Sequence, residues 1–302
     1  MHSDERADRT AFIVAAGTGN GNDLAGVELL VEDDAGIFRS KQIYTTANTC
    51  EYIEDLPIAS QSATGGIYFN NMHVCTNNGK CYQLSRDGEW SESLEWANSN
   101  VDVPITSAIF NSSGNSTWMF FPETGDISIY PQLPSNSALN LPAPSDFPSV
   151  AMINDSAMFV SFSSRKAWIY NIVTNTLIPL PDTKESRLGA ACGVINDGNE
   201  VVLAGGYQKS TYEMINLSVP NPAWRFGLED LGYEPFGARI VPVDNNQRLL
   251  LVGGASSDQA VTTIKSFSGT TYRWTEVGDL NTARFNAAAF SVSLRSLSAV
   301  CS

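Results

Sequence analysis

The sequence is short of basic residues, histidine, cysteine and long apolar runs, and each shortage excludes a class of function. Its 302 residues include 18 Lys and Arg against 32 Asp and Glu, a formal net charge of −14. A surface of that sign repels the phosphates of nucleic acids and of anionic lipids, so we expect neither nucleic acid nor a membrane surface as a partner. No apolar run approaches the roughly 20 residues that span a bilayer.

Histidine is too scarce for most metal and nucleophile chemistry. The two histidines are His2, in a polar N-terminal stretch, and His73, in a strand-like segment. A Ser-His-Asp arrangement would need His73, and no nucleophile-elbow sequence lies near it. We therefore predict a structural role for His73 beside Cys75, no catalytic residue, no metal site and no cofactor.

The five cysteines are too few to build a disulfide-rich fold. Cys75 and Cys81 flank the turn-forming sequence Thr-Asn-Asn-Gly-Lys between two strand-like segments, which places their sulfurs opposite each other across a hairpin. We predict a disulfide there, with two buried free thiols as the alternative. The sequence assigns no partner to the remaining three cysteines, Cys50, Cys192 and Cys301.

Four asparagines fit the N-glycosylation pattern: Asn111, Asn115, Asn154 and Asn216. Together with the hairpin cysteines they favour a secreted or extracellular glycoprotein. The first ten residues, however, are polar and charged where a signal peptide has an apolar centre. Either the natural leader is missing from this chain or the protein is cytoplasmic, which is the alternative localisation.

A β-rich run that ends in small residues recurs along the chain about every 47 residues. It is clearest at 200–208 and 248–256, where the run ends in a Gly pair. The segment 11–19 is the same phrase with Ala16 and Gly17 in place of the pair. With three weaker copies, the aligned positions are Gly17, Thr76, Pro122, Ser163, Gly206 and Gly254.

Each copy is preceded by a strand-like segment rich in small residues and followed by two more, which is typical of four-stranded propeller blades. The first copy lacks the preceding segment, but one follows the last unit at 282–294. A C-terminal strand there would complete the first blade and remove an open sheet edge. We therefore predict an all-β fold, a six-bladed β-propeller over residues 10–296 with four antiparallel strands per blade, closed by that strand. Tails at 1–9, expected to be disordered, and 297–302 flank it.

These features resemble the kelch repeat family and the propeller of galactose oxidase. We interpret the glycines as the residues of tight, left-handed turns and the aromatics as filling between blades. The resemblance is carried by Gly205 and Gly206, Gly253 and Gly254, third-strand Tyr82, Tyr130, Tyr170 and Phe267, fourth-strand Trp90, Trp224 and Trp274, and Arg187 and Arg284 before first strands.

The enzymes of the family that this chain resembles are copper radical oxidases and iron-dependent specifier proteins, and both need histidine ligand sets that His73 alone does not supply. The resemblance therefore implies a non-catalytic interaction module of kelch type, binding a protein partner or a glycan. The alternative is an intracellular kelch adaptor that binds actin or presents substrates to a ubiquitin ligase. Such adaptors usually carry a BTB domain before the propeller.

The topology of a four-stranded blade puts its loops on two faces. Loops joining strands one to two and three to four lie on one face, which holds all four glycosylation sequences. Loops joining strands two to three and four to one lie on the other, which stays free for a partner. We expect binding there by Asn20, Asn22, Asp23, Tyr207, Gln208, Lys209, Asp258 and Gln259.

Overall fold

The structure is a computed structural model that describes residues 10–40, 53–68, 71–77, 80–85, 88–95, 107–110, 117–121, 126–130, 149–154, 157–161, 164–171, 174 and 176–293. These residues form strands β1 to β25 and no helix. Accordingly, the described part of the chain holds no helix that could cross a membrane. The all-β class predicted from the sequence is confirmed.

Consecutive antiparallel strands form sheets of the expected blade type. Three sheets have four strands each, β4–β7, β11–β14 and β15–β18, and β8–β10 form a three-stranded sheet. Their bounds are Ala63–Tyr68, Asn71–Thr76, Lys80–Leu84, Trp90–Glu95, Ser107–Phe110, Thr117–Phe121, Asp126–Tyr130, Ser149–Asn154, Ala157–Ser161, Ala167–Asn171, Thr176–Pro179, Ala191–Ile195, Glu200–Ala204, Tyr212–Asn216 and Arg225–Phe226.

The largest sheet joins two four-stranded blades, β25-β1-β2-β3 and β19-β20-β23-β24, through one parallel bridge between Gly278 and Phe38. A small hairpin, β21 and β22, lies between β20 and β23 in sequence. The bounds are Thr10–Ala15, Val27–Glu32, Phe38–Ser40, Arg239–Val243, Arg248–Val252, Ala255–Ser256, Gln259–Ala260, Thr263–Ser268, Arg273–Asp279 and Ala288–Ser293 for β1–β3, β19–β24 and β25.

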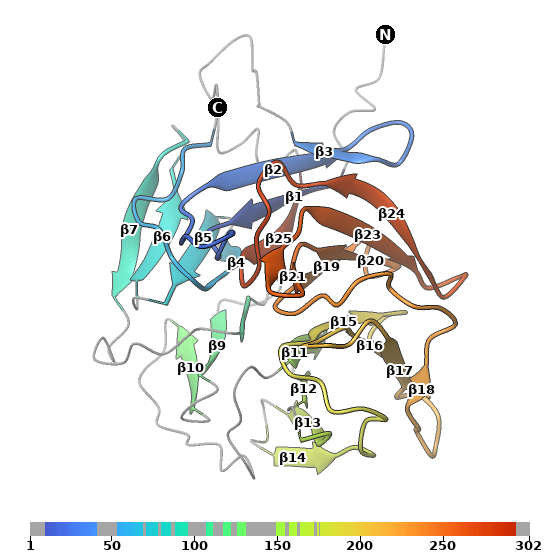
Figure 1. The fold of residues 1–302 in the computed structure, drawn as a ribbon. Helices are drawn as coiled ribbons and strands as arrows, with labels where there is room; N and C mark the ends of the chain where they lie inside the picture. The colour runs from blue at the N-terminus through green and yellow to red at the C-terminus, as the bar shows by residue number, and fades with distance from the viewer. Residues whose placement is uncertain are drawn as a thin grey trace, which may run out of the picture.

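The C-terminal strand completes the first blade, as the sequence predicts. Residues Thr10 to Ala15 of β1 pair with Ser293 to Ala288 of β25 on one edge, and Ala11 to Ala15 pair with β2 on the other. The blade is therefore built from both ends of the described chain. Figure 1 shows β25, in red, beside the blue strand β1.

We count β25 as the first strand of the blade that it forms with β1–β3. The first strand of each blade lies nearest the centre of the molecule (Figure 1). These strands contact one another in the order β25, β4, β8, β11, β15, β19 and back to β25. The outer strands radiate from that centre, which is the arrangement of a β-propeller.

Side chains on both faces of each sheet are buried between neighbouring sheets, which explains the apolar runs of the repeated phrase. On β1, Ile13 packs toward β4–β7 with Val74, while Phe12 packs toward β19–β24 with Leu250. Successive side chains of a strand point to opposite faces, so one strand contributes to two cores. Between blades, Tyr212 of β17 lies 5.7 Å from Phe267 of β23, centroid to centroid, which confirms the predicted filling role of the aromatics.

The fourth strands depart most from expectation. The sequence pattern predicts Trp224 within a fourth strand, but β18 is only Arg225–Phe226, and Trp224 lies just before it. Trp224 still packs edge-on to Phe159 of the neighbouring sheet, centroids 5.7 Å apart, and donates its indole N–H to the Pro181 carbonyl at 2.9 Å. The strand is short because Pro220 and Pro222 nearby have no backbone N–H to donate to the ladder, but the packing of the Trp224 side chain is kept.

Candidate ligand-binding face

The Gly pairs turn the chain from the second to the third strand and bring neighbouring blades together. Gly205 and Gly253 have φ of 67° and 60°, in the left-handed region. Gly254 N donates to Arg284 O of the next blade at 2.9 Å. A Cβ on Gly253 would collide with that same carbonyl oxygen. The predicted role of the pairs, a tight turn with close packing, is confirmed.

Equivalent turns before the first strands are hydrogen-bonded in a row around the centre. Gly237 N donates to Gly189 O at 2.9 Å, Asn286 N to Gly237 O at 2.8 Å, and Ala63 N to Asn286 O at 3.0 Å. The φ angles of Gly189, Gly237 and Asn286 are 64°, 64° and 54°. Each lies two residues before its first strand, so four blades are tied together on one face.

A buried ion pair holds together the end of the β15–β18 blade that carries the Gly pair. Arg187, 3% exposed, lies four residues before β15, and its Nε donates to Glu213 Oε1 of β17 at 2.9 Å. Its Nη1 donates to the carbonyls of Gly205 at 2.8 Å and Thr211 at 2.7 Å. The backbone amide of Glu185 donates to Glu213 at 2.9 Å. One guanidinium thereby joins the incoming loop to the second and third strands.

The same lock occurs in the blade shared by the two ends of the chain. Arg284 Nη2 donates to Glu28 Oε1 of β2 at 2.7 Å, and Nη1 donates to Gly26 O at 2.7 Å and Ala16 O at 3.2 Å. The backbone amide of Thr282 donates to Glu28 at 3.0 Å. Burial lowers the pKa of Arg284, although Glu28 opposes this. Both arginines belong to the sequence pattern, but their glutamate partners were not predicted.

The strand register shows what occupies the glutamate position in the other blades. In β17 this position faces Leu203 of β16. The equivalent pairs, read from the register of second and third strands, are Glu28 with Val14, Cys81 with Cys75, Trp168 with Val160, and Lys265 with Leu251. The predicted disulfide thus lies where two other blades hold a buried carboxylate.

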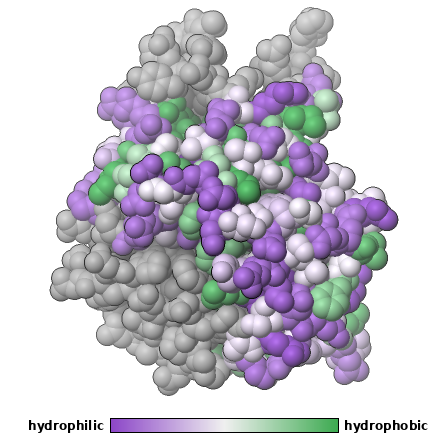
Figure 2. Space-filling model, in the orientation of Figure 1, coloured by the Kyte–Doolittle hydropathy of each residue, from purple (hydrophilic) through white to green (hydrophobic). Residues whose placement is uncertain are grey.

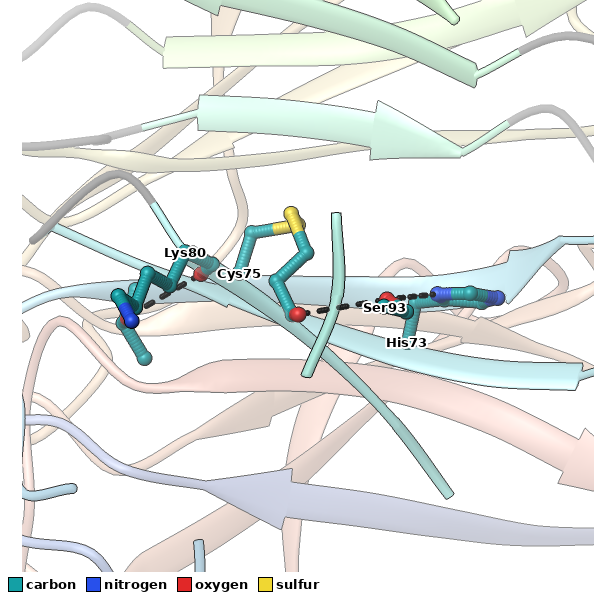
Figure 3. The surroundings of a disulfide bond; sticks show 6 residues. His73, Cys75, Lys80 and Ser93 are labelled. Atoms are coloured by element: carbon teal, nitrogen blue, oxygen red, sulfur yellow. Dashed lines mark hydrogen bonds between the residues drawn. A yellow bond between two sulfur atoms is a disulfide. The ribbon is translucent and has the colours of Figure 1, made fainter. Parts of the chain in front are cut away.

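The Cys75–Cys81 disulfide is present, as predicted, with the two Cα atoms 4.0 Å apart (Figure 3). Ser93 Oγ donates to the carbonyl of Cys81 at 3.3 Å and lies 3.4 Å from His73 Nδ1. Burial lowers the pKa of His73 to about 4, so the imidazole is neutral at physiological pH. A disulfide favours an oxidising compartment. Of the other cysteines, Cys192 is buried and free, and Cys50 and Cys301 lie outside the described residues.

In the blade of β19–β24 a tyrosine hydrogen bond, and neither an ion pair nor a disulfide, holds the turn after the second strand. Its first strand is preceded by Pro235 where two other blades have Arg187 and Arg284, and Lys265 stands at the glutamate position. Tyr233 Oη donates to Gly253 O at 3.2 Å, the contact that Arg187 makes to Gly205. Burial raises the pKa of Tyr233, so its hydroxyl stays protonated and remains a donor.

A row of three aromatic rings crosses this face over three blades. Tyr207 lies in the loop after β16, and Phe236 and Phe285 each lie three residues before a first strand. The Tyr207 and Phe236 centroids are 5.9 Å apart, and those of Phe236 and Phe285 are 6.2 Å apart. Tyr207 is 46% exposed, and both phenylalanines keep part of their surface accessible. Sequence reasoning missed the two phenylalanines.

The predicted binding residues lie on the loops of this face, but they do not form one cluster. All are exposed except Lys209, which is half-buried and lies 3.4 Å from Glu185. Asn20 has a structural contact, because its Oδ1 accepts the Ala260 amide of the neighbouring blade at 2.8 Å. The remaining exposed side chains are those of Asn22, Asp23, Tyr207, Gln208, Asp258 and Gln259.

Two of the predicted glycosylation sites can be located. Asn154 ends the first strand of its blade and is exposed, and Asn216 ends a third strand. Both strand ends belong to the face opposite the Gly pairs. Asn216 accepts from Ser218 N at 2.9 Å and donates to Glu200 Oε1 at 3.3 Å. Asn111 and Asn115 lie outside the described residues.

The surface in Figure 2 is mostly hydrophilic over the described residues, with apolar areas in small separate patches. The large apolar side chains that are most exposed lie on outer segments: Ile178 at 51%, Phe226 at 48% and Leu228 at 64%. Scattered apolar residues of this kind are normal for a soluble surface.

Comparison with known proteins shows the fold. No protein-family model and no curated protein matches the sequence. A solved structure of a fungal alcohol oxidase of the AA5 family, in complex with copper, is similar with a TM-score of 0.57 and 11% identity. The similarity covers 91% of this chain but 64% of that one, less than two thirds of its length. The YjhT structure is similar with a TM-score of 0.51 and 13% identity, over 81% of this chain and 89% of that chain. The fold is of the kelch and galactose oxidase-like propeller type.

The predicted function, a non-catalytic secreted module or an intracellular adaptor, is contradicted by the oxidase match. Scarcity of histidine removes histidine-ligated chemistry only, so it gave no ground for excluding an enzyme. The described residues nonetheless do not fit copper: they hold no group of three or more His, Cys, Asp or Glu side chains able to bind a metal. His73 lies in β5 beside Ser93, and His2 is outside the described residues.

Proposed function

We propose that the chain is a six-bladed propeller of kelch type, with residues 10–296 as its single domain. The cyclic order of first-strand contacts supports six blades, with β8–β10 contributing one of them. Pairing of β25 with β1 supports closure of the ring by the C-terminal strand. The Gly pairs of two blades and the arginines Arg187 and Arg284 before two first strands support the family.

We further propose that the face of the Gly pairs binds a saccharide or a similar ligand rich in hydroxyl groups. The observation that carries this is the row of Tyr207, Phe236 and Phe285, which crosses three blades and remains accessible. The C–H groups of a sugar ring pack on aromatic faces, and nearby polar groups orient the hydroxyls. A hydroxyl-bearing ligand is also what the name of the fungal alcohol oxidase indicates for that protein.

The polar groups beside the row suit such a ligand. Lys209, two positions after Tyr207 in the chain, lies 3.4 Å from Glu185, and Asp258 and Gln259 have exposed side chains in the loop of the next blade. The row is held by backbone hydrogen bonds, because Tyr207 N donates to Leu188 O at 2.8 Å and Phe236 N to Ala255 O at 3.0 Å. A ligand would meet a preformed site, which lowers the entropic cost of binding.

The same proposal includes an extracellular setting. The disulfide supports an oxidising compartment. Glycans on Asn154 and Asn216, with Asn111 and Asn115, would cover the opposite face and leave the aromatic row free. Intact-mass measurement before and after deglycosylation of protein from a secretory host tests this part, and an unchanged mass would contradict it.

A saccharide array followed by calorimetric titration tests the binding. We expect at least one saccharide to bind and Tyr207→Ala to weaken its affinity at least tenfold. Phe226→Ala is the matched control, since that ring is 48% exposed on an outer strand and should leave the affinity unchanged. NMR spectra of the saccharide during incubation report any chemical conversion.

No binding across the array, or equal affinity of the two variants, would contradict the saccharide proposal. A protein partner, the other ligand expected from the sequence, would instead be recognised by a pull-down that depends on the loop tips. Removal of the side chains of Gln208 and Asp258 should weaken that capture while Tyr207→Ala should not.

A further inference from the structure

One charged side chain lies on the first strands that surround the centre of the molecule. Across the described strands β4, β8, β11, β15, β19 and β25, the only charged residue is Arg239, at the start of β19. Its neighbours on these strands are small or apolar, such as Cys192, Ile240 and Ala288. A charge in such surroundings is costly unless something compensates it.

The guanidinium of Arg239 crosses the inner side of the ring. Its Nε donates to Ala287 O, just before β25, at 2.9 Å, and its Nη2 reaches Ala63 O, at the start of β4, at 3.4 Å. Strand β4 belongs to a different blade from β25, so the side chain extends past one blade to the next. Part of its surface remains accessible.

No carboxylate of the described residues neutralises Arg239. Arg187, Arg284 and Arg248 each have an acidic partner within 2.9 Å, but no ion pair of Arg239 occurs in the described part of the chain. Nη1 has no acceptor there either, which leaves its two N–H groups free for a ligand. Both contacts that Arg239 does make are with neutral backbone carbonyls.

The charge state of the site is set by burial. Burial lowers the pKa of Arg239 to about 10, so the guanidinium stays protonated at neutral pH. Burial raises the pKa of the Cys192 thiol, which therefore stays neutral and cannot serve as the counter-ion. A single positive charge is thus held at the centre of a protein of net charge −14.

We propose that Arg239 binds the carboxylate of a small organic acid at the centre of the ring. Guanidinium and carboxylate match in a planar, bidentate geometry, and such pairs are strongest where water is excluded. The residue lies three positions after Phe236, so the anion would enter from the face of the aromatic row. The inference rests on the first strands and stands whether or not a saccharide binds.

Titration of the full chain with sodium acetate and sodium glucuronate tests the proposal, with sodium chloride at equal ionic strength and glucose as references. We expect both carboxylates to raise the melting temperature and to bind at least tenfold more tightly than chloride, with no effect of glucose at this site. Arg239→Met should abolish the carboxylate effect. Arg273→Met is the matched control, because Arg273 is on the same blade, exposed, and at the opposite face.

Arg239→Lys keeps the charge but not the planar fork, and it should bind the carboxylates at least threefold more weakly while remaining folded. It decides the question if Arg239→Met does not fold. The proposal is overturned if carboxylates act on the wild type no more strongly than chloride, or if Arg239→Lys binds them as the wild type does. Arg239 would then be only a structural link between backbone carbonyls.

Discussion

The blades β15–β18 and β4–β7 have the same strand order, but different interactions hold together the end at which the second strand turns into the third. In the first, Glu213 of the third strand is buried and paired with Arg187 from the incoming loop. In the second, the equivalent residue is Cys81, bonded to Cys75 of the second strand. In these two blades a strong cross-link lies at the same register position, although the residue types differ.

The two links differ in what they join. Arg187 connects three segments of the blade through hydrogen bonds to Glu213, Gly205, Thr211 and Glu185, whereas the disulfide connects two adjacent strands. Loss of the arginine would also leave a buried carboxylate without its partner. The ion pair should therefore matter more to stability than the covalent bond.

The largest effect is expected for the blade shared by the two ends of the chain. Deletion of residues 281–302 removes β25 and Arg284, so the blade would lose its first strand and its lock. We expect no cooperative thermal transition by circular dichroism. A chain ending at residue 294 keeps β25 and should melt normally. A normal transition in the shorter chain would show that this strand does not close the ring.

The second-largest loss of stability is expected when the ion pair in β15–β18 is broken. Arg187→Met should lower the free energy of unfolding by about 3–5 kcal/mol, because Glu213 would remain buried and unpaired. Adding Glu213→Leu should restore much of that loss. Arg39→Met, which removes an exposed pair with Asp33, is the control and should change little. Denaturant unfolding measures all three, and equal small losses would contradict the proposed lock.

The β4–β7 blade should be the acid-sensitive one. The pKa of His73 is about 4 in the folded protein and about 6.5 when unfolded, so the unfolded chain binds more protons between these values. The stabilisation is complete above pH 6.5 and is lost as the pH falls toward 4, by roughly 2 to 3 kcal/mol. Unfolding of His73→Gln at pH 7 and pH 4.5 should show a smaller loss than the wild type, and an equal loss would refute the assignment.

A smaller effect is expected for the disulfide. Cys75→Ala with Cys81→Ala should cost about 2 kcal/mol, since the bond closes a short loop and constrains the unfolded chain only modestly. Dithiothreitol should lower the melting temperature of the wild type toward that of the variant and leave the variant unchanged. A wild-type melting temperature that does not respond to reductant would contradict the bond's contribution.

Sequence reasoning predicted those parts of the fold that local patterns encode. The displaced strand at 282–294, the hairpin cysteines and the Gly pairs each have a short signal, and each appears in the structure. The pairing of Arg187 with Glu213 was not predicted, because the two residues are 26 positions apart in the chain and meet only when the strands of the blade pair in register. A recurring glutamate at the second position of third strands, as in Glu28 and Glu213, was the available signal.

The site was less predictable than the fold. The sequence indicates only which loops lie on the same face of the propeller. It therefore did not separate Asn20, whose Oδ1 accepts the Ala260 amide, from the exposed residues of the same loops. Phe285 comes from a different blade from Phe236 and Arg239, and it becomes their neighbour only when the ring closes. The error about catalysis has a different origin, since a residue count can exclude one ligand type but not a reaction.

Hydrogen–deuterium exchange of the full chain, with and without the saccharide that binds best in the array, tests the account most directly. It compares the two faces of one molecule in a single measurement. We expect added protection at 205–211, 234–237 and 284–287, the loops that carry the aromatic row. Protection confined to the opposite loops, 196–199 and 269–272, would contradict it.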